Sequence, residues 1–104
     1  MVARLWSART TAQLSTAYTD YFSQNVLPEL RAIRGFVSAQ VLTRSTAVAA
    51  EVEILVTTTW ESFEAITAFA GADREAAVVH PAAAALLTGY DRRVRHFDVA
   101  VSSV

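Results

Sequence analysis

Residues 51–69 read EVEILVTTTWESFEAITAF and change from a strand-like to a helix-like pattern. The first half, 52–59, is rich in β-branched side chains, which fit the pleated surface of a sheet. Its apolar residues are consecutive rather than alternating, which predicts a strand covered on both faces. In the second half Phe63, Ile66 and Phe69 recur at helical spacing, and Trp60 lies between the two patterns. The stretch therefore predicts a strand that leads directly into an amphipathic helix.

The flanking sequence predicts three more strands. Runs of apolar and β-branched residues predict strands at 2–9, 36–44 and 92–101, in addition to the strand already described, which spans 50–59. Residues 45–49 are expected to form a hairpin connection. The first helix follows a capping box, Thr10-x-x-Gln13, and carries one apolar stripe. Its members are Leu14, Tyr18, Tyr21, Phe22 and Val26. We expect Pro28 to break or restart this helix, because proline lacks the amide N–H.

Further helical segments complete the order β-α-β-β-α-(α)-β. A turn over 29–34 is expected to end at Gly35, and the helix after Ser62 is expected to end near Gly71. A segment over 74–79 follows, and Pro81 opens an Ala-rich helix that ends near Gly89. This order predicts an α+β, ferredoxin-like fold with a four-stranded antiparallel sheet and helices on one face. The apolar residues of the second face predict a homodimer.

Composition restricts the classes of function. With 104 residues, 53% hydrophobic and 18% charged, the chain is expected to form one domain, residues 1–104. No apolar run is long enough for a membrane span, and the N-terminus has no apolar signal region, so we expect a cytoplasmic protein without a membrane partner. The net charge of −1 gives no reason to expect nucleic acid as a partner. Cysteine and lysine are both absent, which excludes cysteine nucleophiles and lysine Schiff bases.

Several pieces of the sequence together resemble a known family. They are Gly35-Phe36 opening the second strand, Thr59-Trp60-Glu61-Ser62 ending the third, the 63–69 helix, and Arg95-His96-Phe97-Asp98-Val99 near the end. In this order the chain resembles, over nearly its full length, the antibiotic-biosynthesis-monooxygenase-like proteins, in which two subunits form a dimeric α+β barrel. Members include cofactor-free oxygenases of anthrones and quinol-like aromatics, and haem-degrading enzymes. The resemblance implies a ligand cavity between the sheet and the helices, with Trp60 at its wall.

The sequence also departs from that family. The oxygenases commonly place an asparagine on the first or third strand, whereas the only asparagine here is Asn25, on the first helix. The first predicted strand carries Arg4, Trp6 and Ser7 instead. The haem degraders place a histidine on the helix that follows the tryptophan, whereas His80 lies beyond a second helical segment.

His80, Trp60 and Arg4 are the candidate catalytic residues. His80 precedes Pro81 at a turn, where an imidazole at a pocket mouth could transfer a proton; the alternative is a surface histidine. Arg4 and Trp6 share one face of the first strand. If that face meets the cavity, Arg4 could stabilise an enolate or phenolate; if it meets the dimer barrel, Arg4 pairs with Glu51 or Glu53.

The candidate substrate-binding residues are aromatic: Trp6, Tyr18, Tyr21, Phe22 and Phe63. Those on the first helix are also suited to pack in the core. The two histidines, His80 and His96, are not spaced as a helical pair and predict no metal site. His96 is expected to pack within the sheet.

Two functions from different classes remain open. The first is a cofactor-independent monooxygenase that acts on a small aromatic or polyketide-type substrate, such as an anthrone or quinol, without any cofactor. The alternative is a non-catalytic dimer that binds a small apolar ligand or haem.

Overall fold

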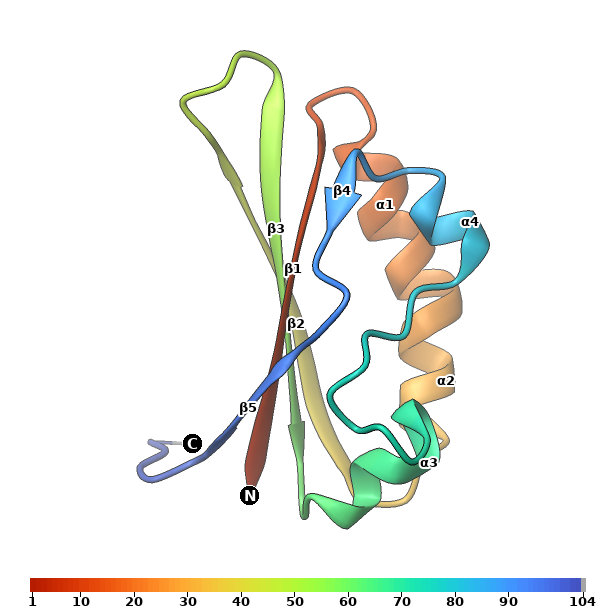
Figure 1. Cartoon of the computed structure of the whole chain (residues 1–104), viewed down its shortest axis with the longest axis vertical. Helices are drawn as coiled ribbons and strands as arrows, with labels where there is room; N and C mark the ends of the chain where they lie inside the picture. Colours follow the sequence, from red (N-terminus) through yellow and green to blue (C-terminus); the bar gives the residue numbers. More distant parts are fainter. Residues whose placement is uncertain (104) are drawn as a thin grey trace.

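The computed structural model describes residues 1–103 as an antiparallel sheet with helices on one face (Figure 1). The strands are β1 (Val2–Thr11), β2 (Phe36–Ser45), β3 (Glu51–Trp60), β4 (Gly89–Tyr90) and β5 (Arg95–Asp98). Their order is β2-β3-β1-β4, and β5 also pairs with β1. The predicted α+β, ferredoxin-like architecture is confirmed.

The last strand, predicted over 92–101, is shorter than expected: β5 spans only Arg95–Asp98, and the separate two-residue strand β4 precedes the predicted range. β4 pairs with Ala8 and Arg9, whereas β5 pairs with the opposite end of β1, from Val2 to Leu5. Between them the backbone pairs with another segment, since Arg93 forms a bridge with Ala76 and the Val94 amide donates to the Glu75 carbonyl. The sheet edge is therefore interrupted where residues 75–77 lie against it.

The helical side of the sheet holds the core. Burial along β3 alternates, with one set of side chains buried against the helices. This set comprises Val52, Ile54, Val56, Thr58 and Trp60. Register places Val2 opposite Trp60 and Arg4 opposite Thr58, so alternate residues of β1 join the same face.

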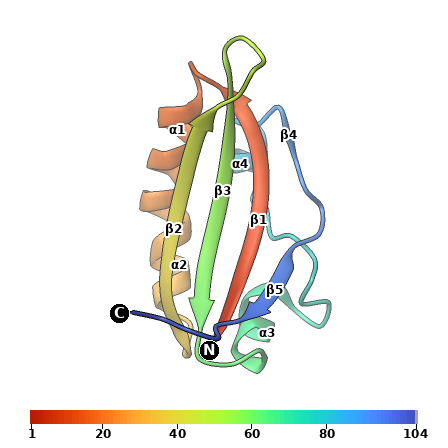
Figure 2. The same ribbon diagram turned by 90° about the vertical axis from the view of Figure 1, so that its left-hand side faces the viewer.

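No helix or strand within residues 1–103 covers the other face of the sheet, although the segment that follows β5 crosses one end of this face (Figure 2). The face presents Leu5, Leu42, Leu55 and Phe97, and Leu42 and Phe97 are exposed. The expectation that β3 is covered on both faces is thus not met by this chain alone. We call these four residues the open face.

The first helical run is continuous. It comprises α1 (Ser15–Tyr21), the π-helical η1 (Phe22–Val26) and α2 (Leu27–Arg31), and the junction residues Tyr21 and Leu27 keep helical dihedral angles. Pro28 therefore does not break the run, because it lies in the first turn of α2 just after the π turn. The predicted capping box is also absent, because β1 extends to Thr11. The hydroxyl of Thr11 instead accepts a hydrogen bond from the Leu14 amide.

Gly35 occupies the turn between α2 and β2. Its φ of +93° favours glycine, and a Cβ there would lie 2.6 Å from the Ala65 Cβ. The turn therefore brings the end of the first helical run close to the segment that follows β3.

The remaining helices are short. They are η2 (Glu64–Ile66), α3 (Thr67–Ala70) and α4 (Pro81–Ala84). The helix predicted over 74–79 does not form, because the carbonyls of Arg74 and Ala76 accept hydrogen bonds from Arg4 and the Ala77 amide donates to Arg92. The helix from Pro81 ends earlier than expected, since the carbonyl of Leu86 accepts the Thr10 hydroxyl. No helix within residues 1–103 is long and apolar enough to cross a membrane.

Candidate active site between the sheet and the helices

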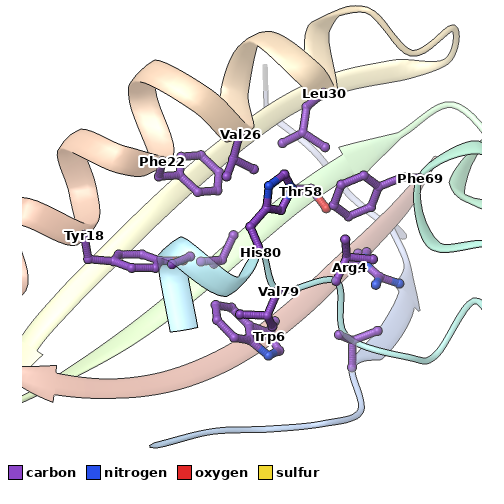
Figure 3. Close-up of a pocket in the computed structure, with 14 residues that line it drawn as sticks. Arg4, Trp6, Tyr18, Phe22, Val26, Leu30, Thr58, Phe69, Val79 and His80 are labelled. Atoms are coloured by element: carbon purple, nitrogen blue, oxygen red, sulfur yellow. The ribbon is translucent and has the colours of Figure 1, made fainter. Parts of the chain in front are cut away.

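A cavity lies between the sheet and the first helical run (Figure 3). Its walls come from β1, β3, α1, η1, α2, α3 and the segment that leads into α4. The lining residues are Arg4, Trp6, Tyr18, Phe22, Val26, Leu30, Val56, Thr58, Phe69, Val78, Val79, His80, Ala83 and Val94. Most are apolar, so the few polar groups determine what chemistry the cavity can support.

The cavity is small in this conformation. Its volume is about 60 Å³, whereas sites for drug-sized ligands measure roughly 300–1,000 Å³. The space suits a few water molecules or a small group, but not a polycyclic ring. A larger ligand therefore requires movement of part of the wall.

Arg4 supplies a buried positive charge. Its side chain is only 4% exposed and donates to the carbonyls of Arg74 and Ala76, the latter at 2.8 Å. Within residues 1–103 it forms no ion pair with a carboxylate. Burial lowers the pKa of Arg4 to about 10, which leaves the guanidinium charged at neutral pH. The cavity therefore contains a cation without an acidic counterion.

His96 lies beside this charge. Its Nε2 is 3.0 Å from Nη1 of Arg4, and its ring packs edge-on against Phe63 at 4.9 Å between centroids. Burial, and then the positive charge of Arg4, lower the pKa of His96. A neutral imidazole that accepts from Arg4 fits this arrangement, so His96 packs within the sheet as expected.

His80 lies at the helical side of the cavity. It is the N-cap of α4, and its backbone is extended because it precedes Pro81. Its Nε2 lies 3.1 Å from Oε2 of Glu29, and its ring meets Tyr21 edge-on at 6.2 Å. About one third of the side chain is exposed. His80 thus lines the cavity and also reaches solvent.

Tyr18 brings a hydroxyl to the cavity from α1. The residue is 3% exposed, and burial raises its pKa to about 12, which keeps the phenol protonated. Within residues 1–103 the hydroxyl forms no hydrogen bond, yet it is not fully enclosed. It is therefore free to donate to a ligand in the cavity.

Trp60 does not line the cavity, contrary to the sequence-based prediction. It is fully buried, and its indole N–H donates to the Thr58 hydroxyl at 2.8 Å. The indole packs against Phe36 and Phe69, with ring centroids 5.5 and 6.0 Å away. Because Phe69 and Thr58 line the cavity themselves, Trp60 forms the layer behind them.

The structure brings together five of the eight predicted site residues: Arg4, His80, Trp6, Tyr18 and Phe22. The other three lie outside the lining. Besides Trp60, these are Tyr21, which contacts His80, and Phe63, which lies under the guanidinium of Arg74 at 4.0 Å. The open question about strand one is also resolved, since Arg4 faces the cavity rather than Glu51 or Glu53.

Several residues that line the cavity were not predicted from the sequence. Val56 and Thr58 share the buried face of β3 with Trp60, so the two-residue period could have identified them. Val78 and Val79 could not be found in this way, because they belong to the segment 74–79, whose conformation was predicted incorrectly. No group of three or more potential metal ligands occurs within residues 1–103.

Comparison with known proteins rests on structure rather than sequence. No protein-family model matches the chain, and no curated protein sequence matches it significantly. A structure assigned as an antibiotic biosynthesis monooxygenase of Bacillus cereus aligns with a TM-score of 0.67 and 17% identity, covering 99% of this chain and 96% of the other.

Two further structures carry ligands. The haem degrader MhuD of Mycobacterium tuberculosis, with two haems bound in its active site, aligns with a TM-score of 0.64 and 23% identity over 100% of both chains. The monooxygenase ActVA-Orf6 of Streptomyces coelicolor, in complex with nanaomycin D, has a TM-score of 0.61 and 19% identity, covering 99% of this chain and 88% of its own. The chain therefore has the ferredoxin-like fold found in antibiotic biosynthesis monooxygenases and in a haem-degrading protein.

Proposed function

We propose that the protein is a cofactor-independent monooxygenase of a small aromatic substrate such as an anthrone or a hydroquinone. The observation that carries this proposal is an apolar cavity with a buried, unpaired arginine and a partly exposed imidazole. Such a site can hold a flat apolar molecule, accept one proton and stabilise negative charge. The shared fold with ActVA-Orf6 supports the proposal.

Substrate entry requires the wall to open. Val78 and Val79 form no backbone–backbone hydrogen bond within residues 1–103, although they line the cavity. The flanking residues are held by backbone hydrogen bonds, since the Ala77 amide donates to the Arg92 carbonyl and the His80 carbonyl accepts from the Ala84 amide. We expect this short segment, 78–79, to move outward when a substrate binds.

His80 is the proposed base. With an anthrone, it removes a proton from the methylene carbon and leaves a carbanion that is delocalised onto the carbonyl oxygen. The carbanion gives up electrons to O2, and a carbon–oxygen bond forms to give a hydroperoxide. Loss of the second methylene proton then breaks the O–O bond and gives the quinone carbonyl and water. One anthrone and one O2 thus yield one anthraquinone and one H2O.

Arg4 and Tyr18 are the proposed stabilisers of the anion. The guanidinium remains charged at neutral pH, and among the described residues, 1–103, it has no carboxylate partner that would offset its field. The raised pKa of Tyr18 keeps its hydroxyl a donor rather than a phenolate. Because both groups are buried, their interaction with a developing oxyanion is stronger than it would be in water.

Oxygen uptake with an anthrone tests the proposal. The wild-type protein should consume O2 in a 1:1 ratio to the quinone formed, and His80→Ala should lower the rate by about 100-fold or more. Asn25→Ala is the matched control, because Asn25 is exposed and bonds only to the Tyr21 carbonyl. Uptake that is no faster than the spontaneous reaction, or unchanged in His80→Ala, would contradict the assignment.

A second candidate is a protein that binds a small ligand without turnover. The small volume of the cavity favours it, and MhuD shows that the fold can bind haem. The cavity as it stands has no room for a porphyrin, and the Nε2 of His80 lies beside Glu29. Titration with hemin distinguishes the candidates: a sharpened Soret band that His80→Ala abolishes would favour haem binding.

We also propose that two copies associate through the open face. Leu42 is 45% exposed and Phe97 is 48% exposed, and both belong to a sheet surface that no helix within residues 1–103 covers. Light scattering on the wild-type protein should give the mass of a dimer, and Leu42→Arg should shift it toward a monomer. Val48→Arg is the control, since Val48 is 62% exposed in the loop between β2 and β3.

A further inference from the structure

The imidazole of His80 is held from three directions. Its backbone is fixed in an extended conformation before Pro81, its Nε2 lies 3.1 Å from Oε2 of Glu29, and its ring packs edge-on against Tyr21. Tyr21 belongs to α1 and Glu29 to α2, two parts of the first helical run, which is far from His80 in the sequence. A surface histidine in a turn needs none of these contacts.

The contact with Glu29 does little for stability. The side chains are 33% and 44% exposed, and ion pairs this exposed contribute about 0–1 kcal/mol. The contact bears instead on which ring nitrogen carries the proton. A carboxylate beside Nε2 favours the tautomer with the proton on Nε2, which leaves the lone pair on Nδ1.

We propose that Glu29 is a positioning residue for His80. It holds the imidazole in one tautomer and orientation, so that Nδ1 acts as the proton acceptor of the cavity, and its negative charge stabilises the imidazolium that forms. This inference rests on the proposed function, because it assigns His80 the role of the base. Glu29 itself does not line the cavity, so it acts through His80.

The position of Glu29 makes it accessible to substitution. It is exposed, follows Pro28 in the first turn of α2, and points its carboxylate toward a residue of another element. Glu29→Ala removes the contact, whereas Glu29→Gln retains an oxygen that can accept from Nε2–H but removes the charge. Glu64→Ala is the matched control, since Glu64 is exposed and lies outside the cavity lining.

The test measures the ring nitrogens of His80 by 15N NMR in the full chain without ligand, with His80→Ala used to assign the signals. In the wild type and in Glu64→Ala, the two nitrogen shifts of the neutral ring should be widely separated. Glu29→Ala should bring them closer, because a ring in water averages the two tautomers. Glu29→Gln should keep most of the separation. Identical spectra for Glu29→Ala and wild type would overturn the proposal.

Oxygen uptake with an anthrone provides the second measurement. Glu29→Ala should lower kcat by about tenfold with KM little changed, and Glu29→Gln should fall between it and the wild type. An unchanged kcat in Glu29→Ala would also overturn the proposal. A wild-type protein that consumes no oxygen would overturn only the proposed function, because the NMR result still decides whether Glu29 fixes the ring.

Discussion

Nη1 of Arg4 lies 3.0 Å from Nε2 of His96, although the two residues are 92 positions apart in the chain. The contact joins β1 to β5 at the edge of the cavity, where Arg4 also holds the carbonyls of residues 74 and 76. It places a neutral imidazole beside a buried cation. The free energy of unfolding should therefore depend on the protonation of His96 and hence on pH.

His96 makes the protein less stable as the pH falls. Its pKa is lowered by burial and by Arg4, and Arg74 and Glu75 also act on it with opposite signs. Because the unfolded chain binds the proton more readily, stability is fully present above the unfolded value of 6.5 and is lost as the pH falls through the lower folded value. Urea unfolding between about pH 7.5 and 5 should show this loss.

The control for this prediction is the variant His96→Gln, which has no titrating ring. It should lose less stability than the wild type over the same range, whereas Asn25→Ala should retain the wild-type dependence. If the free energy of unfolding fell equally with pH in His96→Gln and in the wild type, the loss of stability would not come from protonation of His96 beside Arg4.

Arg4→Lys should destabilise the segment that forms one side of the cavity. Lysine has a single ammonium group and cannot reproduce the fork that reaches Arg74, Ala76 and His96. We expect a loss of about 2 kcal/mol in the free energy of unfolding, the cost of losing hydrogen bonds to a buried charged group. Hydrogen exchange should accelerate at the Ala77 amide before it does in β3. Unchanged exchange there would mean that Arg4 does not hold the segment.

Tyr18 should ionise at a higher pH than a tyrosine in water. Burial raises its pKa to about 12, so absorbance titration of the folded protein should show one late phase that Tyr18→Phe removes. Because the unfolded chain releases this proton near the ordinary value of 10.0, stability contributed by the neutral phenol is lost as the pH rises from that value toward 12. If Tyr18→Phe leaves the titration curve unchanged, the hydroxyl is not in a desolvated site.

Substitution of Trp60 should affect folding rather than catalysis. Trp60→Phe removes part of a fully buried indole and its hydrogen bond to Thr58, which should cost about 2 kcal/mol. Oxygen uptake per folded molecule should stay within about twofold of the wild type, since Phe69 stands between the indole and the cavity. A large fall in rate without a fall in stability would show that Trp60 acts on the substrate.

The sequence predicted the sheet because strand periodicity is a local property. The run of β-branched residues along 52–59 specified one strand, and the two-residue period of a strand placed Arg4 and Trp6 on one face. Which face meets the cavity was not predictable, because that depends on where the helices pack. The failed helix over 74–79 has a similar cause: its carbonyls are bonded to Arg4, a residue from the other end of the chain.

The residues of the candidate site were likewise predictable only where the signal is local in the sequence. His80 was identified because an imidazole before a proline is chemically distinctive, and Tyr18 and Phe22 because they lie on one helical stripe. The contact of His80 with Glu29 could not be read from the sequence, where Glu29 looks like any exposed helix carboxylate. The position taken by Phe69 beside Trp60 likewise depends on how α3 folds back on the sheet.

The proposed function requires that an aromatic substrate bind between the sheet and the helices. The most direct test adds an anthrone to the labelled protein without oxygen and maps the NMR shift changes of backbone amides and methyl groups. We expect the largest changes at the amides and methyl groups of Val79, Ala83, Val56 and Thr58, and at the amide of His80. Changes confined to Leu42, Leu55 and Phe97 on the open face, or no changes at all, would contradict the proposed function.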